Sequence, residues 1–245
     1  MIVILLTACI NPDGMPFTAL TNQQERERQY LDAIRYYLST TKLNIIFVEN
    51  SGTDISHLFK AYIETGRLEC LTFPGNQYKS RGKGYGECEI IEYALINSRL
   101  LQSDRNIRIV KITGRLIVKN LKTIIRIHDL LLSRKTVLFA INSDMSFPDS
   151  RCIIAPIGFY KKFLKMKEII NDSTGYYFEH ALLDTIKTEK EYSYSPFFIQ
   201  PDIVGISGST GKIFKSVSHS ITHMYKYAKY VISLRSKFAT KYRTK

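Results

Sequence analysis

The stretch Ser80-Arg-Gly-Lys-Gly-Tyr-Gly-Glu-Cys-Glu89, together with Lys111-Ile-Thr-Gly-Arg115, organises the rest of the chain. Glycine lets backbone N–H groups approach a ligand closely, and the start of a helix adds partial positive charge. Arg81 and Lys83 add two cations at the same place. The segment therefore predicts a loop that holds phosphate oxygens, followed by a helix over 88–101; the alternative is a surface turn with solvated charges. Its spacing matches neither the P-loop nor the dinucleotide-binding fingerprint.

Short apolar runs and amphipathic stretches alternate along the chain. The first run, Met1–Ile10, is apolar on both faces, which is typical of a strand at the centre of a covered sheet. Strands that alternate with helices predict an α/β fold, a Rossmann-like and mostly parallel sheet flanked by helices. Further strands are expected at 43–48, 68–73, 107–112 and 137–141, and further helices at 22–39, 55–65, 120–133, 159–171 and 177–187.

Polar turns follow the ends of these expected strands. Asn11–Gly14, Glu49–Gly52 and Asn142–Asp144 each come directly after an apolar run, and Thr113–Arg115 does the same. In parallel α/β sheets, ligands bind outside the carboxyl ends of the strands. We therefore expect these turns to meet residues 81–89 at one rim of the sheet.

The charge of the chain is unevenly distributed. Its 245 residues carry 35 Lys or Arg against 22 Asp or Glu, and nine of the basic residues lie in Lys212–Lys245, which has no acidic residue. The body is therefore only mildly basic, and a hydrophobic content of 44% is that of a globular domain. Four widely spaced cysteines form no CxxC pair, which argues for a reducing compartment and against a zinc site. The apolar start is too short to span a bilayer and lacks the flanks of a signal peptide, so a cytoplasmic protein is expected.

The basic segment 212–245 is expected to form an amphipathic helix. Ile221, Met224, Ala228 and Val231 recur at helical spacing, and lysines occupy the opposite side at positions 215, 226, 229 and 237. Such a helix favours contact with an anionic membrane surface, which predicts a peripheral protein at the inner face of the cytoplasmic membrane. In the alternative interpretation, the apolar stripe packs on the domain and the lysines face water.

Four motifs follow one another in this order: the first strand with its Asn-Pro-Asp-Gly turn, Phe47-Val-Glu-Asn-Ser-Gly52, Lys83-Gly-Tyr-Gly-Glu87 and Lys111-Ile-Thr-Gly-Arg115. Through these motifs the chain resembles bacterial glycosyltransferases of the GT-A fold from capsule and O-antigen polysaccharide biosynthesis clusters. The resemblance covers about residues 1–215. It implies a nucleotide-sugar-binding catalytic domain over 1–211, followed by the basic tail over 212–245. It also implies a nucleotide-diphosphate sugar as donor and a lipid-linked glycan as acceptor.

The resemblance places the donor over the first strands of the sheet. It implies that the base and ribose lie near the ends of the first two strands and that the diphosphate lies near the glycine-rich segment. The donor-binding candidates are Thr7, Ala8, Glu49, Asn50, Arg81, Lys83, Lys111 and Arg115.

One departure from the family concerns the metal. GT-A enzymes usually carry Asp-x-Asp after the fourth strand, where it holds a divalent cation on the diphosphate. Here that strand ends in Lys111-Ile-Thr-Gly-Arg115 without an acidic residue. Positioned cations can stabilise a departing diphosphate directly, so we predict metal-independent transfer with Lys83, Lys111 and Arg115 as the phosphate clamp. The alternatives are surface ion pairs for Lys111 and Arg115, and a displaced metal site at Asp144 and Asp149.

An inverting enzyme needs a base that takes the proton of the acceptor hydroxyl. In the family, that carboxylate lies at the start of a later helix, which makes Glu179 the first candidate and Asp144 the second. The alternative role for Glu179 is a favourable interaction with the helix dipole, and a retaining enzyme needs no such base. A glycine-rich segment further on is either a mobile lid over the donor or a connector to the tail. The lid candidates are Ser207, Gly208, Ser209, Thr210 and Lys212.

These features predict a hexosyl- or N-acetylhexosaminyltransferase that uses a nucleotide-sugar, UDP-sugars foremost, as its substrate and requires no cofactor. A nucleic-acid-binding protein is the alternative suggested by a pI near 9.5, although the basic residues form no known RNA-binding motif, so nucleic acid is not favoured as a partner. Another nucleotide-dependent transferase, such as a nucleotidyltransferase, is the third interpretation. That activity calls for a paired-carboxylate metal site, for which the sequence offers no convincing position.

Overall fold

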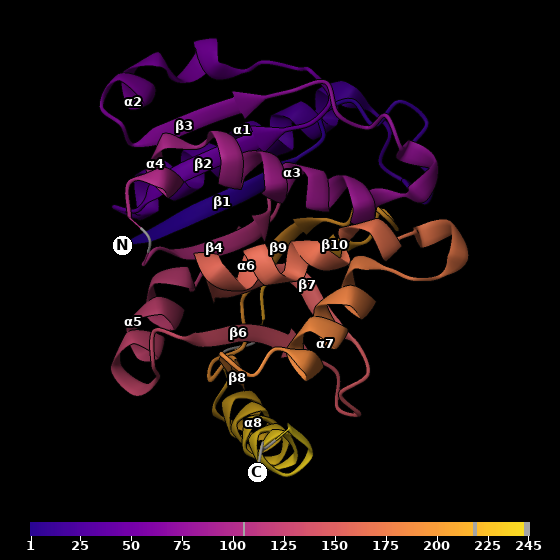
Figure 1. The fold of residues 1–245 in the computed structure, drawn as a ribbon. Coiled ribbons are helices and arrows are strands. Elements are labelled where there is room, and N and C mark those ends of the chain that lie inside the picture. Colours follow the sequence, from indigo (N-terminus) through magenta and orange to yellow (C-terminus); the bar gives the residue numbers. More distant parts are fainter. Residues whose placement is uncertain (105, 218–219, 243–245) are drawn as a thin grey trace.

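The fold is built on a seven-stranded sheet. The computed structural model describes residues 1–104, 106–217 and 220–242. Its strands have the spatial order β3-β2-β1-β4-β7-β6-β8; β1 to β4 are mutually parallel, whereas β7 is antiparallel to both of its neighbours. The predicted α/β class, a mostly parallel sheet flanked by helices, is confirmed (Figure 1). The strands are β1 (Ile2–Ala8), β2 (Asn44–Glu49), β3 (Leu68–Thr72), β4 (Arg108–Thr113), β6 (Thr136–Ile141), β7 (Pro148–Pro156) and β8 (Ser193–Pro196).

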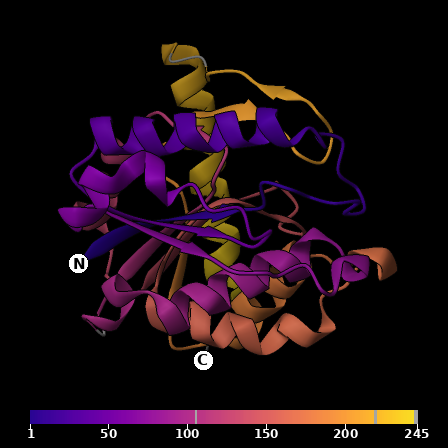
Figure 2. The ribbon, with the colours of Figure 1, turned by 90° about the horizontal axis from the view of Figure 1, so that it is seen from above.

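Helices cover both faces of the sheet, with α1 on one side and α3 and α6 on the other (Figure 2). Successive side chains of β1 alternate between the two faces of the sheet. Val3 and Leu5 pack in the core under α3, whereas Ile4 and Leu6 pack in the core under α1. A second sheet joins β5 (Ile117–Val118), β9 (Ile203–Ile206) and β10 (Ile213–Phe214). The helices are α1 (Gln23–Thr40), α2 (Lys60–Glu64), α3 (Lys83–Asn97), α4 (Arg99–Gln102), α5 (Leu121–Leu131), α6 (Ile157–Phe163), α7 (Phe178–Thr188) and α8 (Ile221–Tyr242), with 3-10 turns η1 (Ser56–Phe59), η2 (Lys79–Arg81), η3 (Leu164–Ile169) and η4 (Asp172–Thr174).

Several elements depart from the sequence-based expectations, and the short strands β5, β8, β9 and β10 were not among those expected. Strand β7 was not anticipated, because its first half is polar and only its second half is an apolar run. The helix expected over 159–171 is shorter, since α6 ends at Phe163 and continues as the 3-10 turn η3. The helix expected over 88–101 begins earlier, at Lys83, and ends at Asn97; the Ser98 side chain then caps the separate helix α4.

The C-terminal helix α8 packs against the edge strand β8. Val231 and Leu234 are buried, and Leu234 joins the core cluster that lies under α3. The Tyr227 hydroxyl donates to the carbonyl oxygen of Phe197 at 3.0 Å, and the Tyr230 hydroxyl donates to the carbonyl oxygen of Ile141. The face of α8 between Tyr227 and Leu234 therefore fastens the tail to the sheet.

This packed face is not the apolar stripe expected from the sequence. Of that stripe only Val231 is buried, whereas Ile221 is 86% and Met224 is 57% exposed. The stripe was misplaced because Tyr227 and Tyr230, which supply the packed surface, were not counted as apolar. Tyrosines with an apolar ring and a polar tip suit such a boundary, since each hydroxyl reaches a carbonyl of the sheet. Within the part of the chain that the structure describes, no helix is both long and apolar enough to cross a membrane.

Candidate functional site

A cavity of about 470 Å³ opens at the carboxyl ends of β1 and β4. This is the point where the strand order changes direction, since β2 and β3 lie on one side of β1 and β4 lies on the other. In open α/β sheets such a switch point leaves a crevice in which ligands bind. The walls come from the end of β1, the first turns of α1, α3 and α7, the start of β7, and the segment that follows β9.

Four cationic side chains line this cavity: Arg151, which is paired with Asp149, and three others, Arg26, Lys83 and Arg115. Arg26 donates to the carbonyl oxygens of Cys9 and Leu20, at 2.9 Å from Nε and 3.0 Å from Nη1. Arg115 Nη1 donates to the carbonyl oxygen of Ile206 at 2.8 Å and to the Gln29 side chain at 3.3 Å. These partners are neutral oxygens, so the guanidinium charges are held in place without being neutralised.

Lys83 completes this cationic cluster. Its ammonium donates to the Ser209 hydroxyl at 2.5 Å and to the carbonyl oxygen of Phe17. Burial, opposed by the charge of Asp172 and assisted by those of Arg115 and Arg26, lowers the pKa of Lys83 to about 8. Within the described residues, none of the three cations forms an ion pair with a carboxylate. Concentrated positive charge of this kind favours a polyanion such as a diphosphate.

The segment 207–209 lies directly over the cations. Ser207, Gly208 and Ser209 line the cavity, and the carbonyl oxygen of Gly208 accepts hydrogen bonds from the backbone of residues 19 and 20. A Cβ at position 208 would lie 2.2 Å from Nη2 of Arg115, so a larger residue there would displace the guanidinium from its present place. Three of the five lid candidates thus contact the cavity, while Thr210 and Lys212 lie outside its lining and are exposed.

A pair of carboxylates occupies another part of the cavity wall. Glu179, in the first turn of α7, accepts a hydrogen bond from the Ser150 hydroxyl at 2.5 Å. Burial raises the pKa of Glu179, and the nearby charge of Glu87 raises it further. Glu87 in turn accepts a hydrogen bond from the Thr7 hydroxyl at 3.0 Å. A half-buried carboxylate with a raised pKa is suited to accept a proton from a hydroxyl group.

Lys111 lies behind this wall rather than in the cavity. Its side chain is 0% exposed; the ammonium is paired with the Glu87 carboxylate and donates to the carbonyl oxygen of Ser150 at 2.6 Å. The Phe178 ring lies 5.2 Å from the same ammonium. The alternation of β4 explains the placement, because Lys111 points into the core under α3 and α7. Lys111 therefore positions the two carboxylates, by its contacts with Glu87 and Ser150. It does not face the cavity, so of the predicted phosphate clamp only Lys83 and Arg115 line it.

The glycine-rich segment is the first turn of α3 and not a loop ahead of it. Gly82 has φ +92°, and a Cβ there would lie 2.4 Å from Asp172. The Asp172 carboxylate accepts the backbone N–H of Gly84 at 3.1 Å, and burial raises the pKa of Asp172. The amides that the sequence suggested for phosphate therefore bind a carboxylate of the chain itself. The glycines let the start of α3 pack closely against η4.

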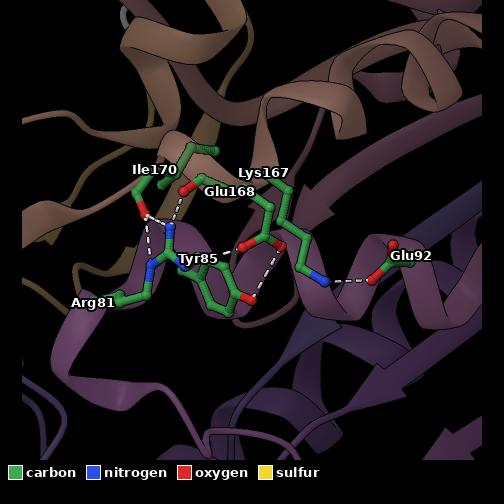
Figure 3. A network of polar contacts seen from close by, with 6 residues as sticks. All are labelled: Arg81, Tyr85, Glu92, Lys167, Glu168 and Ile170. Carbon is green, nitrogen blue, oxygen red and sulfur yellow. Dashed lines mark hydrogen bonds and ion pairs between the residues drawn. The ribbon is translucent and has the colours of Figure 1, made fainter.

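Arg81 does not line the cavity; it belongs to a separate polar network (Figure 3). Its guanidinium donates to the carbonyl oxygen of Ile170 at 3.2 Å and 3.1 Å, and pairs with the Glu168 carboxylate at 3.2 Å. It also lies 4.1 Å from the centre of the Tyr85 ring. Figure 3 shows the same network continuing to the ion pair between Lys167 and Glu92. Arg81 thus ties η2 and α3 to η3.

The remaining predicted residues divide between the cavity and the core. Thr7, Ala8 and Asn50 line the cavity, and the Asn50 amide donates to Asn76 at 2.9 Å. Glu49 is 0% exposed and accepts backbone N–H groups of Ile10, Ser51 and Thr53. Its carboxylate organises the turn after β2 instead of facing a ligand.

Asp144 lies in a separate cavity, in a turn after β6 where Ser146 donates to it through both its backbone and its hydroxyl. These hydrogen bonds lower the pKa of Asp144. Asp149, named in the alternative metal site, pairs with Arg151. No group of three or more His, Cys, Asp or Glu side chains in residues 1–104, 106–217 and 220–242 is arranged to hold a metal ion.

Sequence reasoning missed Arg26, Glu87 and Ser150 as site residues. Arg26 carried a recognisable signal, because it lies four residues before Tyr30 and therefore on the face of α1 that packs against the sheet. An arginine on a buried helical face requires partners or a ligand. Ser150 lies at the start of the unanticipated strand β7, and its position depends on antiparallel pairing with β4.

Comparison with known proteins gives no family for this chain. No family model and no curated protein matches its sequence. Among solved structures, it is similar to a cytidylyltransferase from Leptospira borgpetersenii serovar Hardjo-bovis, with a TM-score of 0.47 and 11% identity over 100% of this chain and 98% of the other. It is also similar to residues 1–349 of TarS from S. aureus in complex with UDP, with a TM-score of 0.45 and 13% identity over 96% of this chain and 65% of the other. At these values the similarities do not decide the activity.

Proposed function

We propose that this chain is a glycosyltransferase that moves a sugar from a nucleotide-diphosphate sugar, UDP-sugars foremost, to a lipid-linked glycan of the capsule or O-antigen kind. The observation that carries the proposal is the convergence of Arg26, Lys83 and Arg115 on a cavity that also contains Glu179. The three cations suit a diphosphate, and the half-buried carboxylate of Glu179 suits a hydroxyl proton.

The proposed reaction is a displacement at the anomeric carbon. An acceptor hydroxyl oxygen forms a bond to that carbon while the bond from the carbon to the β-phosphate oxygen breaks. The electron pair of the broken bond leaves with the nucleoside diphosphate, and the hydroxyl proton passes to Glu179. Attack from the side opposite the leaving group gives inversion, and Lys111 holds Glu87 and Ser150 so that Glu179 keeps its place.

We further propose that the cationic cluster takes the role of a counterion for the leaving group. The charge of the diphosphate grows as the bond to the sugar breaks, and fixed cations next to it stabilise the transition state more than the ground state. Transfer then proceeds without a divalent metal. The neutral hydrogen-bond partners of Arg26 and Arg115 support this role, because they fix the guanidinium groups without cancelling their charge.

Support for a lipid-linked acceptor comes from the outer face of α8. Ile221, Met224, Tyr225 and Ile232 are 86%, 57%, 59% and 68% exposed, and 100° per residue places them on one side of the helix. Exposed Lys226 and Lys229 lie along one flank of this stripe. An apolar stripe bordered by lysines fits the interface of an anionic bilayer. We therefore propose a peripheral location at the inner face of the cytoplasmic membrane.

The experiment that tests the proposal is incubation of the purified chain with a panel of UDP-, GDP- and CMP-sugars, in EDTA and in manganese. We expect release of the free nucleotide from at least one donor, and thermal stabilisation by the corresponding nucleotide, at equal levels in both conditions. If no donor in the panel releases its nucleotide and no nucleotide stabilises the chain, sugar transfer is contradicted. Release of pyrophosphate from CTP or UTP in the presence of a sugar phosphate would instead show a nucleotidyltransferase, and dependence on manganese would overturn the metal-independent step.

A further inference from the structure

A second cavity of about 520 Å³ lies next to the first and has a different chemical character. Its walls are the turn after β6, the residues just before α7, and one face of α7 along its length. The cavity is lined by Asp144, Met145, Ser146, Gly175, Tyr176, His180, Leu183, Asp184 and Lys187.

The two cavities meet at the start of α7. Glu179 lines the first cavity and His180, the next residue, lines the second. The Tyr177 side chain lines the first cavity and stacks on the His180 ring, with ring centres 5.3 Å apart and an interplanar angle of 26°. A ligand in the second cavity therefore lies one side chain away from the carboxylate to which we assign the proton transfer.

The polar groups of the second cavity do not suit an anion. Asp184 accepts the Tyr176 hydroxyl at 2.8 Å and the Lys187 ammonium at 3.0 Å, so the one lysine in the lining is neutralised. Asp144 remains as a carboxylate whose donors, both from Ser146, are neutral. Carboxylate oxygens have lone pairs beyond those already used, and sugar hydroxyls are suitable donors to them. The charge thus opposes phosphate and favours a neutral polyhydroxyl ligand.

Aromatic rings add a surface for the apolar face of a sugar. Tyr176 and Tyr177 both pack on His180, and the half-exposed Phe147 meets the same ring edge-to-face at 5.5 Å. The backbone N–H of Tyr177 donates to His180 Nδ1 at 3.1 Å, which places the proton of the neutral imidazole on Nε2 as a further donor. Ligand pockets commonly combine such rings with a few fixed polar groups.

The turn that forms one wall is held by α8. Lys237 Nζ donates to the carbonyl oxygen of Ser143 at 3.0 Å, and Tyr230 donates to that of Ile141. The loop between β6 and β7 reaches down toward α8 in Figure 1. The second cavity is therefore next to the helix that we assign to the membrane, on the side from which a lipid-linked chain would arrive.

We propose that this second cavity binds the terminal sugar of the acceptor glycan as a neutral saccharide, with its reactive hydroxyl directed past Tyr177 toward Glu179. This inference rests on the proposed function and names the acceptor subsite of that reaction. The two cavities then divide the substrates by charge: the cationic one takes the diphosphate of the donor, and the acidic, aromatic one takes the uncharged acceptor.

The test uses the His180 ring as a local reporter in the full chain. The imidazole NMR signals are titrated with methyl glycosides of glucose, galactose, N-acetylglucosamine and rhamnose, and the His180 signal is assigned with His180→Gln. We expect at least one glycoside to shift the His180 signal saturably while that of His57, on the distant turn η1, stays unchanged. Asp184→Ala should weaken this binding about tenfold or more, as expected for loss of a hydrogen bond to a charged group.

Two controls make the outcome decisive. Tyr176→Phe keeps the ring but removes the hydroxyl that orients Asp184, so it should weaken binding even if Asp184→Ala does not fold. Asp32→Ala, on the exposed side of α1, should bind like the wild type. If UDP binds and no glycoside shifts His180, or if neither variant at the cavity weakens binding, the acceptor site is overturned while the proposed function stands. If no nucleotide or nucleotide-sugar binds either, the proposed function itself fails.

Discussion

Lys83 and Arg115 face the same cavity from different elements, the first turn of α3 and the segment after β4, and the charge of Arg115 helps to lower the pKa of Lys83. Like charges brought together by a fold destabilise it unless a ligand of opposite charge is present. The arrangement is therefore a property of a binding site rather than of a core. It yields a test that separates binding from stability.

Lys83→Met should weaken nucleotide-diphosphate binding by roughly 10- to 100-fold, because a charged hydrogen bond to the ligand is lost. The same substitution should raise the melting temperature of the ligand-free protein, since folding lowers the pKa of Lys83 from 10.5 to about 8 and so disfavours its charged form. In the wild type this penalty is fully present below about pH 8 and is relieved as the pH rises toward 10.5. Calorimetric titration with UDP and thermal melts across this range measure both effects.

Lys79→Met is the matched control, because Lys79 lies nearby on η2 but pairs with Asp13 at 2.7 Å outside the cavity lining. It should leave UDP affinity unchanged. A Lys83 variant that is less stable than the wild type, or that binds UDP equally well, would contradict the assignment of Lys83 to the anion site.

Glu179→Gln should lower the turnover of sugar transfer by about 10²- to 10⁴-fold, the usual contribution of a general base, with a much smaller effect on donor affinity. Because burial and Glu87 raise the pKa of Glu179 above 4.5, wild-type turnover should fall as the pH drops through that raised pKa. This acid limb should be missing from the residual activity of the variant. Glu189→Gln, at the end of α7, serves as the control. If the turnover or the acid limb of the Glu179→Gln variant were unchanged, a group other than Glu179 would be the general base.

The sequence predicted the class of fold and the location of the site better than the roles of single residues. Continuous apolar runs such as Leu43–Val48 and the turns that follow them are local signals, and they placed the cavity at the carboxyl ends of the strands. The direction of a side chain at a strand end is not local. Lys111 and Glu49 are both buried. Which face of the sheet each side chain lies on depends on the register of several neighbouring strands.

The tail illustrates the same limit. Helical periodicity predicted α8, but the sequence contains two apolar faces on that helix, and periodicity alone does not say which one the sheet buries. Tyr227, Tyr230 and Leu234 face the sheet because their partners lie next to the edge strand β8 and at the end of β6, far away in the sequence. The expected membrane face is therefore different in composition from the one proposed from the structure.

Lys111→Met tests whether this residue binds phosphate or supports the carboxylates. The substitution leaves the Glu87 carboxylate without its buried partner, which should lower the free energy of unfolding by about 3–5 kcal/mol. The double variant Lys111→Met/Glu87→Gln should recover part of this loss, because no charge is then left unpaired. Denaturant unfolding of the two single variants and the double variant gives the coupling. Additive losses, or a stable Lys111→Met with greatly weakened UDP binding, would restore Lys111 to the phosphate clamp.

Ile232→Glu should reduce binding of the chain to vesicles that contain anionic phosphatidylglycerol, because it places a carboxylate in the middle of the exposed stripe on α8, where Ile232 is 68% exposed. Lys229→Glu, on the flank of the stripe, should weaken binding by roughly 2 kcal/mol, since one attractive charge is replaced by a repulsive one. Ile96→Glu is the matched control: Ile96 is 63% exposed at the end of α3, away from α8, and its substitution should have no effect. Vesicle flotation at low and high salt measures these differences. Equal flotation of all three variants, equal binding to neutral phosphatidylcholine vesicles, or a dimer in solution that Ile232→Glu dissociates would show that the stripe meets something other than an anionic bilayer.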